Sequence, residues 1–492
     1  MNLVRKLLPA DSADSAAPAL TEGARQWSFG ELRAAAASIA AVLAERGIGA
    51  GDRVVLLSGN DVAFVAAYLG ILAAGGIATP LNPQAPMPEL EREIALVEAS
   101  LVLRGPACAG LALANAVDIE PLFSTGKGGL DPVDRADDDG AVLLFTSGTA
   151  GAPRAALLTH GNLAANIDQV QRHPGLRVGP RDVGLVMLPC FHVFGLNVAL
   201  GVALAAGMHN ILLGSFDAAE AVRAIAEHEV TIVAGVPTMY DAMLELGDDV
   251  APPDALRSLR LAVSGAAELP PRIGRAFHDR FGVVLHEGYG LTEASPIVTT
   301  NAADPEPRWG SIGPPVPGVE VRLVGPKGED VLVGDPGEIW VRGPNVFPGY
   351  WRDPEASERV LAGGWLHTGD VAVAEPDGML RLVDRSKDLV IVSGFNVFPN
   401  EVEDALLTFP DVIDAAVIGV PDRRTGEAVA AFVVCAEGCS PAVDEVREHV
   451  ARSLARYKVP STIDFVEELP RNVAGKLLRR ELRAPDATRN PA

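Results

Sequence analysis

A run of hydroxyl, glycine and basic residues directly follows a hydrophobic stretch in the first third of the chain. Residues 146–154 read TSGTAGAPR, and the apolar residues Ala141–Phe145 precede them. Glycine lets backbone N–H groups approach a ligand, hydroxyls donate hydrogen bonds, and arginine neutralises negative charge. The run therefore predicts an oxyanion-binding loop, although it lacks the G-x-x-x-x-G-K-[ST] spacing of a P-loop. A solvated turn rich in Ser, Thr and Gly is the alternative.

Four other segments carry side chains that suit a nucleotide. Residues Tyr289–Glu293 (YGLTE) combine a flat ring for a base with Thr and Glu oxygens of the kind that Mg²⁺ binds beside phosphates. The carboxylate of Asp370, in the segment 365–370 (WLHTGD), could accept both hydroxyls of a ribose. The other two segments are 384–388 (DRSKD) and 472–476 (NVAGK). Taken alone, each segment also fits an ordinary turn, helix cap or solvated charge run.

Lysine is rare in this chain, which draws attention to the positions where it occurs. Only six of the 41 basic residues are lysines, and two of them, Lys387 and Lys476, lie in the last two segments. Because the ammonium group is compact and the guanidinium is a planar fork, a retained lysine indicates a need for a point charge.

The composition excludes several classes of protein. With 41 basic and 64 acidic residues the net charge is −23, so the chain lacks the overall positive field of a nucleic-acid-binding protein. The serines do not lie in G-x-S-x-G, no H-E-x-x-H occurs, and the nine histidines show no metal-ligand spacing. The N-terminus lacks the apolar core of a signal peptide, and four scattered cysteines fit a reducing compartment. We expect a cytoplasmic protein without integral membrane contact or a nucleic-acid partner, and leave the oligomeric state open.

Buried-strand and helix patterns alternate through the first 300 residues. Strands are predicted at 53–58, 141–145, 183–188, 231–234, 259–263 and 283–286, and helices at 61–74, 161–173, 217–228 and 272–281. This alternation predicts parallel sheets in α/β layers.

The pattern changes near Pro305. Short alternating strands punctuated by Gly and Pro predict a small β-subdomain over 320–383. From Asn400 helix and strand alternate again, in a stretch long enough to fold by itself. We place the boundary within 384–388, which divides the chain into a large domain, 1–386, and a C-terminal domain, 387–492.

Taken in order, these segments resemble the adenylate-forming superfamily, which comprises acyl-CoA synthetases, adenylation domains of peptide synthetases, and luciferases. Further segments extend the resemblance over nearly the whole chain, at 27–32 (WSFGEL), 73–76 (AAGG), 80–83 (PLNP), 188–195 (LPCFHVFG), 264–267 (SGAA), 337–339 (GEI), 457–460 (YKVP) and 475–476 (GK). Among these relatives the chain looks most like the fatty acyl-CoA synthetases.

The resemblance implies a fold and a reaction. The fold is α/β, with two flavodoxin-like layers and a small β-barrel in the large N-terminal part and a mobile α+β lid at the C-terminus. In the reaction, a carboxylate attacks the α-phosphate of MgATP to give acyl-AMP and pyrophosphate, and a thiol, such as that of coenzyme A (CoA), then displaces AMP. Two anions must meet in the first step, so positive charge and alignment are required.

The resemblance also implies roles for individual residues. Arg154 and Lys476 would neutralise phosphate charge, Lys476 at the α-phosphate, and His192 would lie beside the acyl carboxylate. Mg²⁺ would bind Thr146 and Glu293. Lys387 would be the hinge of the lid. The residues expected to bind ATP or CoA are Thr146, Ser147, Gly148, Thr149, Gly151, Arg154, Gly265, Ala266, Glu287, Gly288, Tyr289, Gly290, Thr292, Asp370, Arg385 and Lys476, with Ser393 and Gly394 lining the channel for pantetheine.

The phosphate loop departs from the usual family sequence T-S-G-T-T-G-x-P-K-G. Ala150 replaces a hydroxyl, Arg154 a lysine and Ala155 a glycine. Ile391 stands where relatives often carry a basic residue. The loop retains its positive charge, and the chain retains Glu293, Asp370 and Lys476. We therefore expect an active enzyme. A fold that only binds nucleotide or acyl-CoA is the non-catalytic alternative.

The acceptor and the acid are less strongly determined. Free CoA is the simplest acceptor because no carrier-protein segment follows Lys476, and loading of a separate carrier protein is the alternative. The segment 183–213 contains only two histidines and one cysteine as ionisable groups, so no buried cation is at hand for a second carboxylate. The apolar run Asn197–Met208 suits an alkyl or aryl tail, or is ordinary core. We expect a medium- or long-chain fatty acid.

We expect Lys476→Ala to abolish acyl-AMP formation and to spare thioester formation from supplied acyl-AMP. Loss of one contact to the developing charge typically costs ~2.7–4 kcal/mol in barrier. The two half-reactions are measured separately, by pyrophosphate release and by thioester formation. Equal loss of both would contradict a role confined to the first step.

Overall fold

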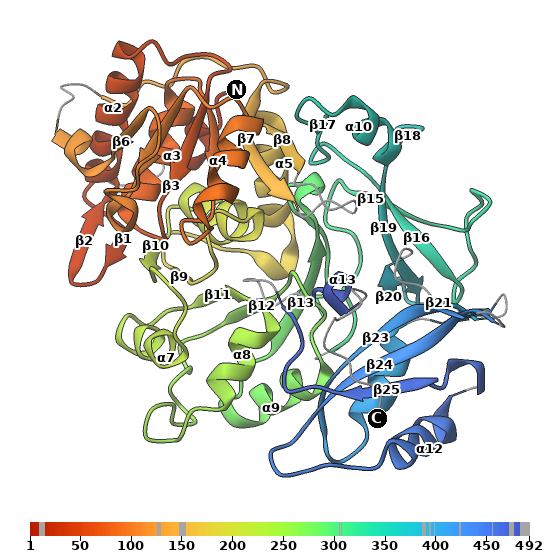
Figure 1. Ribbon diagram of the computed structural model, residues 1–492. Coiled ribbons are helices and arrows are strands. Elements are labelled where there is room, and N and C mark those ends of the chain that lie inside the picture. Colours follow the sequence, from red (N-terminus) through yellow and green to blue (C-terminus); the bar gives the residue numbers. More distant parts are fainter. Residues whose placement is uncertain are drawn as a thin grey trace. The chain divides into compact units, whose positions relative to one another are not determined.

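The computed structural model describes residues 1–8, 15–124, 129–146, 154–304, 306, 308–385, 390–392, 395–397, 399–422, 425–454, 456–471 and 477–482 (Figure 1). The chain forms two compact units. The first comprises Met1–Val321 and Val341–His367, and the second Arg322–Trp340 and Thr368–Ala492. The predicted division at residue 386 remains a prediction, because the segment 386–389 lies outside the described residues.

The first unit contains a seven-stranded sheet. Its order is β17 (Gly349–Tyr350), β8 (Arg154–Thr159), β7 (Gly140–Thr146), β4 (Ile77–Pro80), β3 (Arg53–Leu57), β5 (Leu101–Arg104) and β6 (Ala116–Asp118). The strands from β7 to β6 are parallel, whereas β8 is antiparallel to both β7 and β17. The strand β8 was not predicted; it begins immediately after the predicted phosphate loop.

Helices of this sheet begin at the polar residues that the sequence supplies. Asp61 caps α3 (Val62–Ala73) by accepting the N–H of Phe64, and every residue of this uncharged helix is buried. Ser28 and Glu31 form a reciprocal capping box at the start of α2 (Phe29–Glu45), which contacts α3. In the described chain no helix is both long and apolar enough to cross a membrane.

A second sheet of eight strands lies in the same unit. Its order is β14 (Ile297–Thr300), β13 (Leu285–Gly290), β12 (Leu261–Ser264), β11 (Ile232–Gly235), β9 (Val183–Val186), β10 (His209–Leu212), β1 (Pro18–Glu22) and β2 (Arg25–Ser28). Only the two edge strands, β14 and β2, run antiparallel to their neighbours. The carboxyl ends of β9, β11, β12 and β13 therefore meet at one edge of the sheet, where α/β folds bind ligands.

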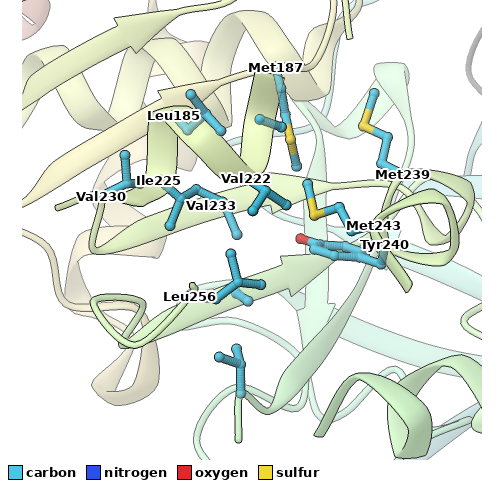
Figure 2. Packing of buried hydrophobic residues seen from close by; sticks show 14 of the residues in the cluster. Leu185, Met187, Val222, Ile225, Val230, Val233, Met239, Tyr240, Met243 and Leu256 are labelled. Carbon is cyan, nitrogen blue, oxygen red and sulfur yellow. The ribbon is translucent and has the colours of Figure 1, made fainter. Parts of the chain in front are cut away.

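One large hydrophobic cluster holds this sheet to its helices, among them α7 (Ala218–Glu227), α8 (Pro237–Leu244) and α9 (Pro271–Phe281). Figure 2 shows side chains of this cluster, among them Met187, Met239 and Tyr240, with Met243 nearest to the Tyr240 ring. Tyr240 is fully buried, and its hydroxyl donates a 2.8 Å hydrogen bond to the carbonyl of Val263 in β12. The cluster thus fixes α8 against the strand that leads to the sheet edge.

The segment predicted as a β-subdomain forms a five-stranded sheet. The order is β15 (Glu320–Val324), β16 (Pro336–Arg342), β19 (Trp365–Ala374) and β18 (Leu361–Ala362), and β20 (Leu380–Arg385) pairs with β19. The short helix predicted at 354–360 is α10 (Pro354–Val360).

The C-terminal part has its own sheet and core. The order is β22 (Phe395–Val397), β21 (Val390–Val392), β24 (Gly426–Cys435) and β23 (Val412–Asp422), with β25 (Thr462–Phe465) parallel to β24. Buried residues of α11 (Pro399–Leu407) and α12 (Val443–Ser453) belong to one hydrophobic cluster with these strands. The α/β class, with a β-subdomain and a mixed α+β C-terminal part, is confirmed.

Glu287 is a buried carboxyl group in the middle of β13. Its side chain accepts the N–H of Leu269 at 3.0 Å, while its Oε2 is buried without a hydrogen-bond partner among the described residues. Burial raises the pKa of Glu287 from 4.5 to about 8. The carboxyl group therefore holds a proton at neutral pH in the folded chain.

We expect the stability conferred by neutral Glu287 to fall as pH rises. The unfolded chain releases this proton near pH 4.5 and the folded chain near pH 8, so stability declines between these values. Each unit of pKa difference is worth ~1.4 kcal/mol. The urea midpoint of the wild type should therefore drop relative to that of Glu287→Gln between pH 5 and pH 8.

The exposed Glu220 of α7 provides a matched control, because Glu220→Gln makes the same chemical change in water. A constant difference in midpoint between wild type and Glu287→Gln across this pH range would contradict a protonated Glu287.

Candidate functional site

Three predicted site segments meet at the carboxyl edge of the eight-stranded sheet. His192 follows β9, Gly265 and Ala266 follow β12, and Glu287 to Gly290 lie in β13. The backbone register aligns Ser264 with Glu287, so these segments end side by side. Close packing explains Gly265, because a Cβ there would lie 3.1 Å from the ring of Phe194.

Not every glycine of these segments is available for a ligand. A Cβ at Gly290 would lie 2.3 Å from the carbonyl oxygen of Pro296, so the return from β13 to β14 requires glycine. The Glu287 carboxyl group lies in the interior, and Tyr289 is only 8% exposed. The backbone of Glu287 to Gly290 remains a candidate for contact with the adenine base.

His192 supplies a neutral polar group to this edge. Its Nε2 is buried and has no hydrogen-bond partner in the described part of the chain. Burial lowers the pKa of His192 from 6.5 to about 4, so the imidazole is uncharged at pH 7. Its ring lies 4.7 Å from that of Phe191, centroid to centroid. A neutral imidazole can donate a hydrogen bond to a carboxylate without adding a charge.

Hydrogen bonds from other segments to its backbone carbonyls hold the turn that carries Glu293. The carbonyls of Glu293, Ala294 and Ser295 accept hydrogen bonds from the Phe347 N–H at 2.9 Å and from the Asn345 and Asn197 side-chain amides, both at 2.8 Å. Both asparagines are buried, so these bonds are shielded from water.

Two further buried amides complete this network. Asn166 of α5 (His160–Arg172) donates to the carbonyl of Ile297 and accepts the N–H of the same residue. Gln169 donates to Asn345 at 3.1 Å and accepts from Asn166 at 2.9 Å. We call Asn166, Gln169, Asn197 and Asn345 the amide network.

The two described ends of the predicted phosphate loop lie on antiparallel strands. Thr146 ends β7 and Arg154 begins β8, and the two are paired directly across the strands. The residues Ser147, Gly148, Thr149 and Gly151 lie outside the described residues. The Nε of Arg154 donates to Asp353 Oδ2 at 3.1 Å, and the guanidinium carries two further NH₂ groups that suit phosphate oxygens.

Glu293 is the carboxylate of this region that suits a metal ion. Its Oε1 accepts a 2.6 Å hydrogen bond from the hydroxyl of Tyr350, which leaves Oε2 as a candidate metal ligand. Among the described residues no three His, Cys, Asp or Glu side chains gather into a metal site. Mg²⁺ bound with a triphosphate needs only one or two carboxylates, so Glu293 and the Thr146 hydroxyl fit this ion by ligand type.

In the second unit, Asp370 lies in β19, and hydrogen bonds fix the backbone of this residue and of its neighbour Gly369. Its N–H donates to Thr368 Oγ1, and the N–H of Gly369 donates to Glu338 Oε1 at 2.9 Å. Asp370 and Arg385 are paired in register between β19 and β20. The two residues predicted to bind ribose are therefore neighbours in one sheet.

The expected residues Lys387, Ser393, Gly394 and Lys476 lie outside the described part of the chain. The residues on either side of 472–476 are well anchored. Arg471 and Leu477 form a β-bridge, and Arg471 pairs with Asp414 at 2.7 Å.

A buried ion pair anchors the residues that follow this bridge. Arg479, in α13 (Arg479–Leu482), donates to both carboxylate oxygens of Glu403 at 2.7 and 2.8 Å. Burial raises the pKa of Glu403, and Arg479 opposes this shift. Breaking such a pair typically costs ~3–5 kcal/mol because one charge stays buried alone.

Two arginines beyond the segment 183–213, Arg257 and Arg272, already have carboxylate partners. Arg272 binds both oxygens of Asp241, at 2.9 and 3.1 Å, and Arg257 pairs with Asp254 at 3.7 Å. The apolar run Asn197–Met208 is mostly core, although Val198 and Ala199 stay partly exposed. They lie in a π-helix, Phe194–Val202, a rare element that is frequent at functional sites.

Sequence reasoning missed the residues that support the site. Tyr350 and Asp353 lie about 200 residues beyond Arg154 in the chain, and no local pattern links them to it. The amide network was missed for the same reason. A signal was present in Asn166, Asn197 and Asn345, since asparagine inside an apolar stretch must find a partner.

Comparisons with known proteins agree over nearly the whole chain. The sequence profile of the AMP-binding enzyme family matches residues 10–351, and that of the AMP-binding enzyme C-terminal domain matches residues 401–476. A feruloyl-CoA synthase of an Amycolatopsis species is 38% identical over 95% of this chain and 95% of its own length. A long-chain-fatty-acid–CoA ligase of Yersinia pestis is 35% identical over 95% and 91%, respectively.

A solved structure matches equally well. The crystal structure of ATP-bound MatB from Rhodopseudomonas palustris has a TM-score of 0.92 with this chain, at 34% identity and 98% coverage of both chains. The family profile covers well over half of the sequence, and the motifs follow the order that the resemblance required. The chain therefore belongs to the AMP-binding enzyme family.

Proposed function

We propose that this chain is an AMP-forming ligase that joins a carboxylic acid to CoA through an acyl-AMP intermediate. The observation that carries the proposal is the placement of Arg154 and Glu293, a cation for phosphate and a carboxylate for Mg²⁺, both held by the segment 349–353. The similarity to CoA ligases over 95% of the chain supports the same reaction class.

The first step joins two anions. An oxygen of the acid's carboxylate attacks the α-phosphorus of ATP, and the bond from that phosphorus to pyrophosphate breaks. Arg154 would stabilise the leaving pyrophosphate and Lys476 the α-phosphate, while neutral His192 donates a hydrogen bond to the acid. Bound Mg²⁺ would offset the charge of the phosphates. Such preorganised charge is worth most where water is excluded.

In the second step, a C–S bond to CoA replaces the C–O bond between the acyl carbon and AMP. The thiolate of CoA attacks the acyl carbonyl, the C–S bond forms, and AMP leaves with the C–O bond electrons. Ser393 and Gly394 are proposed to line the pantetheine channel, and Lys387 is proposed to be the hinge between domains 1–386 and 387–492. A separate carrier protein as the acceptor is the second candidate.

For the acid, we propose a monocarboxylate with an apolar tail. Among such acids, a medium- or long-chain fatty acid is the preferred candidate. The pairing of Arg257 and Arg272 with Asp254 and Asp241 supports a single carboxylate, because a second one would compete for occupied cations. The partly exposed Val198 and Ala199 support an apolar tail. A hydroxycinnamic acid is the alternative that the 38% identity to a feruloyl-CoA synthase favours.

A panel of acids tests the activity and the acid together. It contains saturated acids of eight to sixteen carbons, ferulate, cinnamate, malonate and succinate, and pyrophosphate release and acyl-CoA are both measured. We expect the highest kcat/KM for an apolar monocarboxylate, with AMP as the nucleotide product. A dicarboxylate at the top would contradict the proposed acid, and ATP binding without any pyrophosphate release would favour the non-catalytic alternative.

A further inference from the structure

One short segment contacts both charged groups of the phosphate site. Tyr350 lies in β17, next to β8, with its Cα in register with Ala156. The N–H of the following residue, Trp351, donates to the carbonyl of Ala155 at 2.7 Å. The segment 349–353 is thereby fixed beside the first residues of β8, directly after the phosphate loop.

Each charged group receives a different kind of partner from this segment. The hydroxyl of Tyr350 donates to Glu293 Oε1 at 2.6 Å, and Asp353 Oδ2 accepts from Arg154 at 3.1 Å. The Tyr350 ring also lies near the Arg154 guanidinium, 5.8 Å from its centroid to Cζ. Tyr350 therefore contacts Glu293 through its hydroxyl and lies beside Arg154 through its ring.

We propose that Tyr350 is a positioning residue for the proposed metal ligand Glu293. Its neutral hydroxyl holds one carboxylate oxygen without adding a charge and leaves the other oxygen for the metal ion. This inference rests on the proposed function, in which Glu293 binds Mg²⁺. Asp353 has the complementary role of holding Arg154 with an opposite charge, while its Oδ1 caps α10 through Ala356 N.

Two features keep Tyr350 in this role. The Tyr350 N–H donates to Ser357 Oγ at 2.9 Å, and its ring packs edge-on against Phe347, whose N–H in turn holds the Glu293 carbonyl. The carboxylate and the backbone of Glu293 are thus both fixed from residues 347–350.

The test compares Tyr350→Phe with wild type by calorimetric binding of ATP at several Mg²⁺ concentrations and in EDTA. The variant loses only the hydroxyl and keeps the ring. Loss of a group that orients a metal ligand typically lowers metal affinity ~10–100-fold. We expect the Mg²⁺ concentration for half-maximal ATP binding to rise about tenfold, with ATP affinity in EDTA unchanged. Asp353→Asn, the matched control, should change ATP binding equally with and without Mg²⁺.

A double mutant separates this inference from the proposed function. If Tyr350 acts through Glu293, Tyr350→Phe should add nothing to the Mg²⁺ effect of Glu293→Gln. A lower melting temperature for Tyr350→Phe with an unchanged Mg²⁺ midpoint would overturn the inference and leave a purely structural role. An unchanged Mg²⁺ midpoint for Glu293→Gln itself would instead overturn the metal assignment in the proposed function.

Discussion

Four buried amide side chains fix the turn on which the proposed chemistry depends. The amide network binds the backbone on both sides of the Ser295 bend, so the position of Glu293 is set from α5, from the π-helix and from the segment 345–347. Unpaired amides in an interior cost ~1–3 kcal/mol each, which makes such a network stable only when it is complete. The local structure around Glu293, the proposed metal ligand, is therefore set by distant parts of the first unit.

Burial sets the protonation states of two ionisable groups in this region, His192 and Glu287. His192 and Glu287 are neutral at pH 7 because burial penalises their charged forms, which shifts the pKa of the imidazole down and that of the carboxyl up. Arg154 and Glu293 lie nearer to water and have polar partners. His192, the group that would face the acid, is thus uncharged, whereas an arginine and a carboxylate would face the phosphates and the metal ion.

Much of this architecture could be predicted from the sequence. The helices α3, α7 and α9 and the strands β3, β7 and β9 lie within a few residues of their predicted positions, because their apolar periodicity and caps are local signals. The strand β8 was missed since it follows a Gly-rich loop, and the two-residue strand β17 since its only support is pairing with β8. The charged site residues were singled out by their types and spacing, and the resemblance supplied their expected roles. Their supports were missed, because Tyr350 contacts Glu293, and the amide network contacts the turn, across more than 30 residues of sequence.

The most direct test of the central claim follows the oxygen atoms of the acid. If a carboxylate oxygen attacks the α-phosphorus and a thiol then displaces AMP, the acid's oxygen leaves with the nucleotide. With a substrate acid carrying ¹⁸O in both carboxylate positions, mass spectrometry should find one ¹⁸O atom in each AMP formed. Label in inorganic phosphate together with ADP, or AMP without label, would contradict an acyl-AMP intermediate.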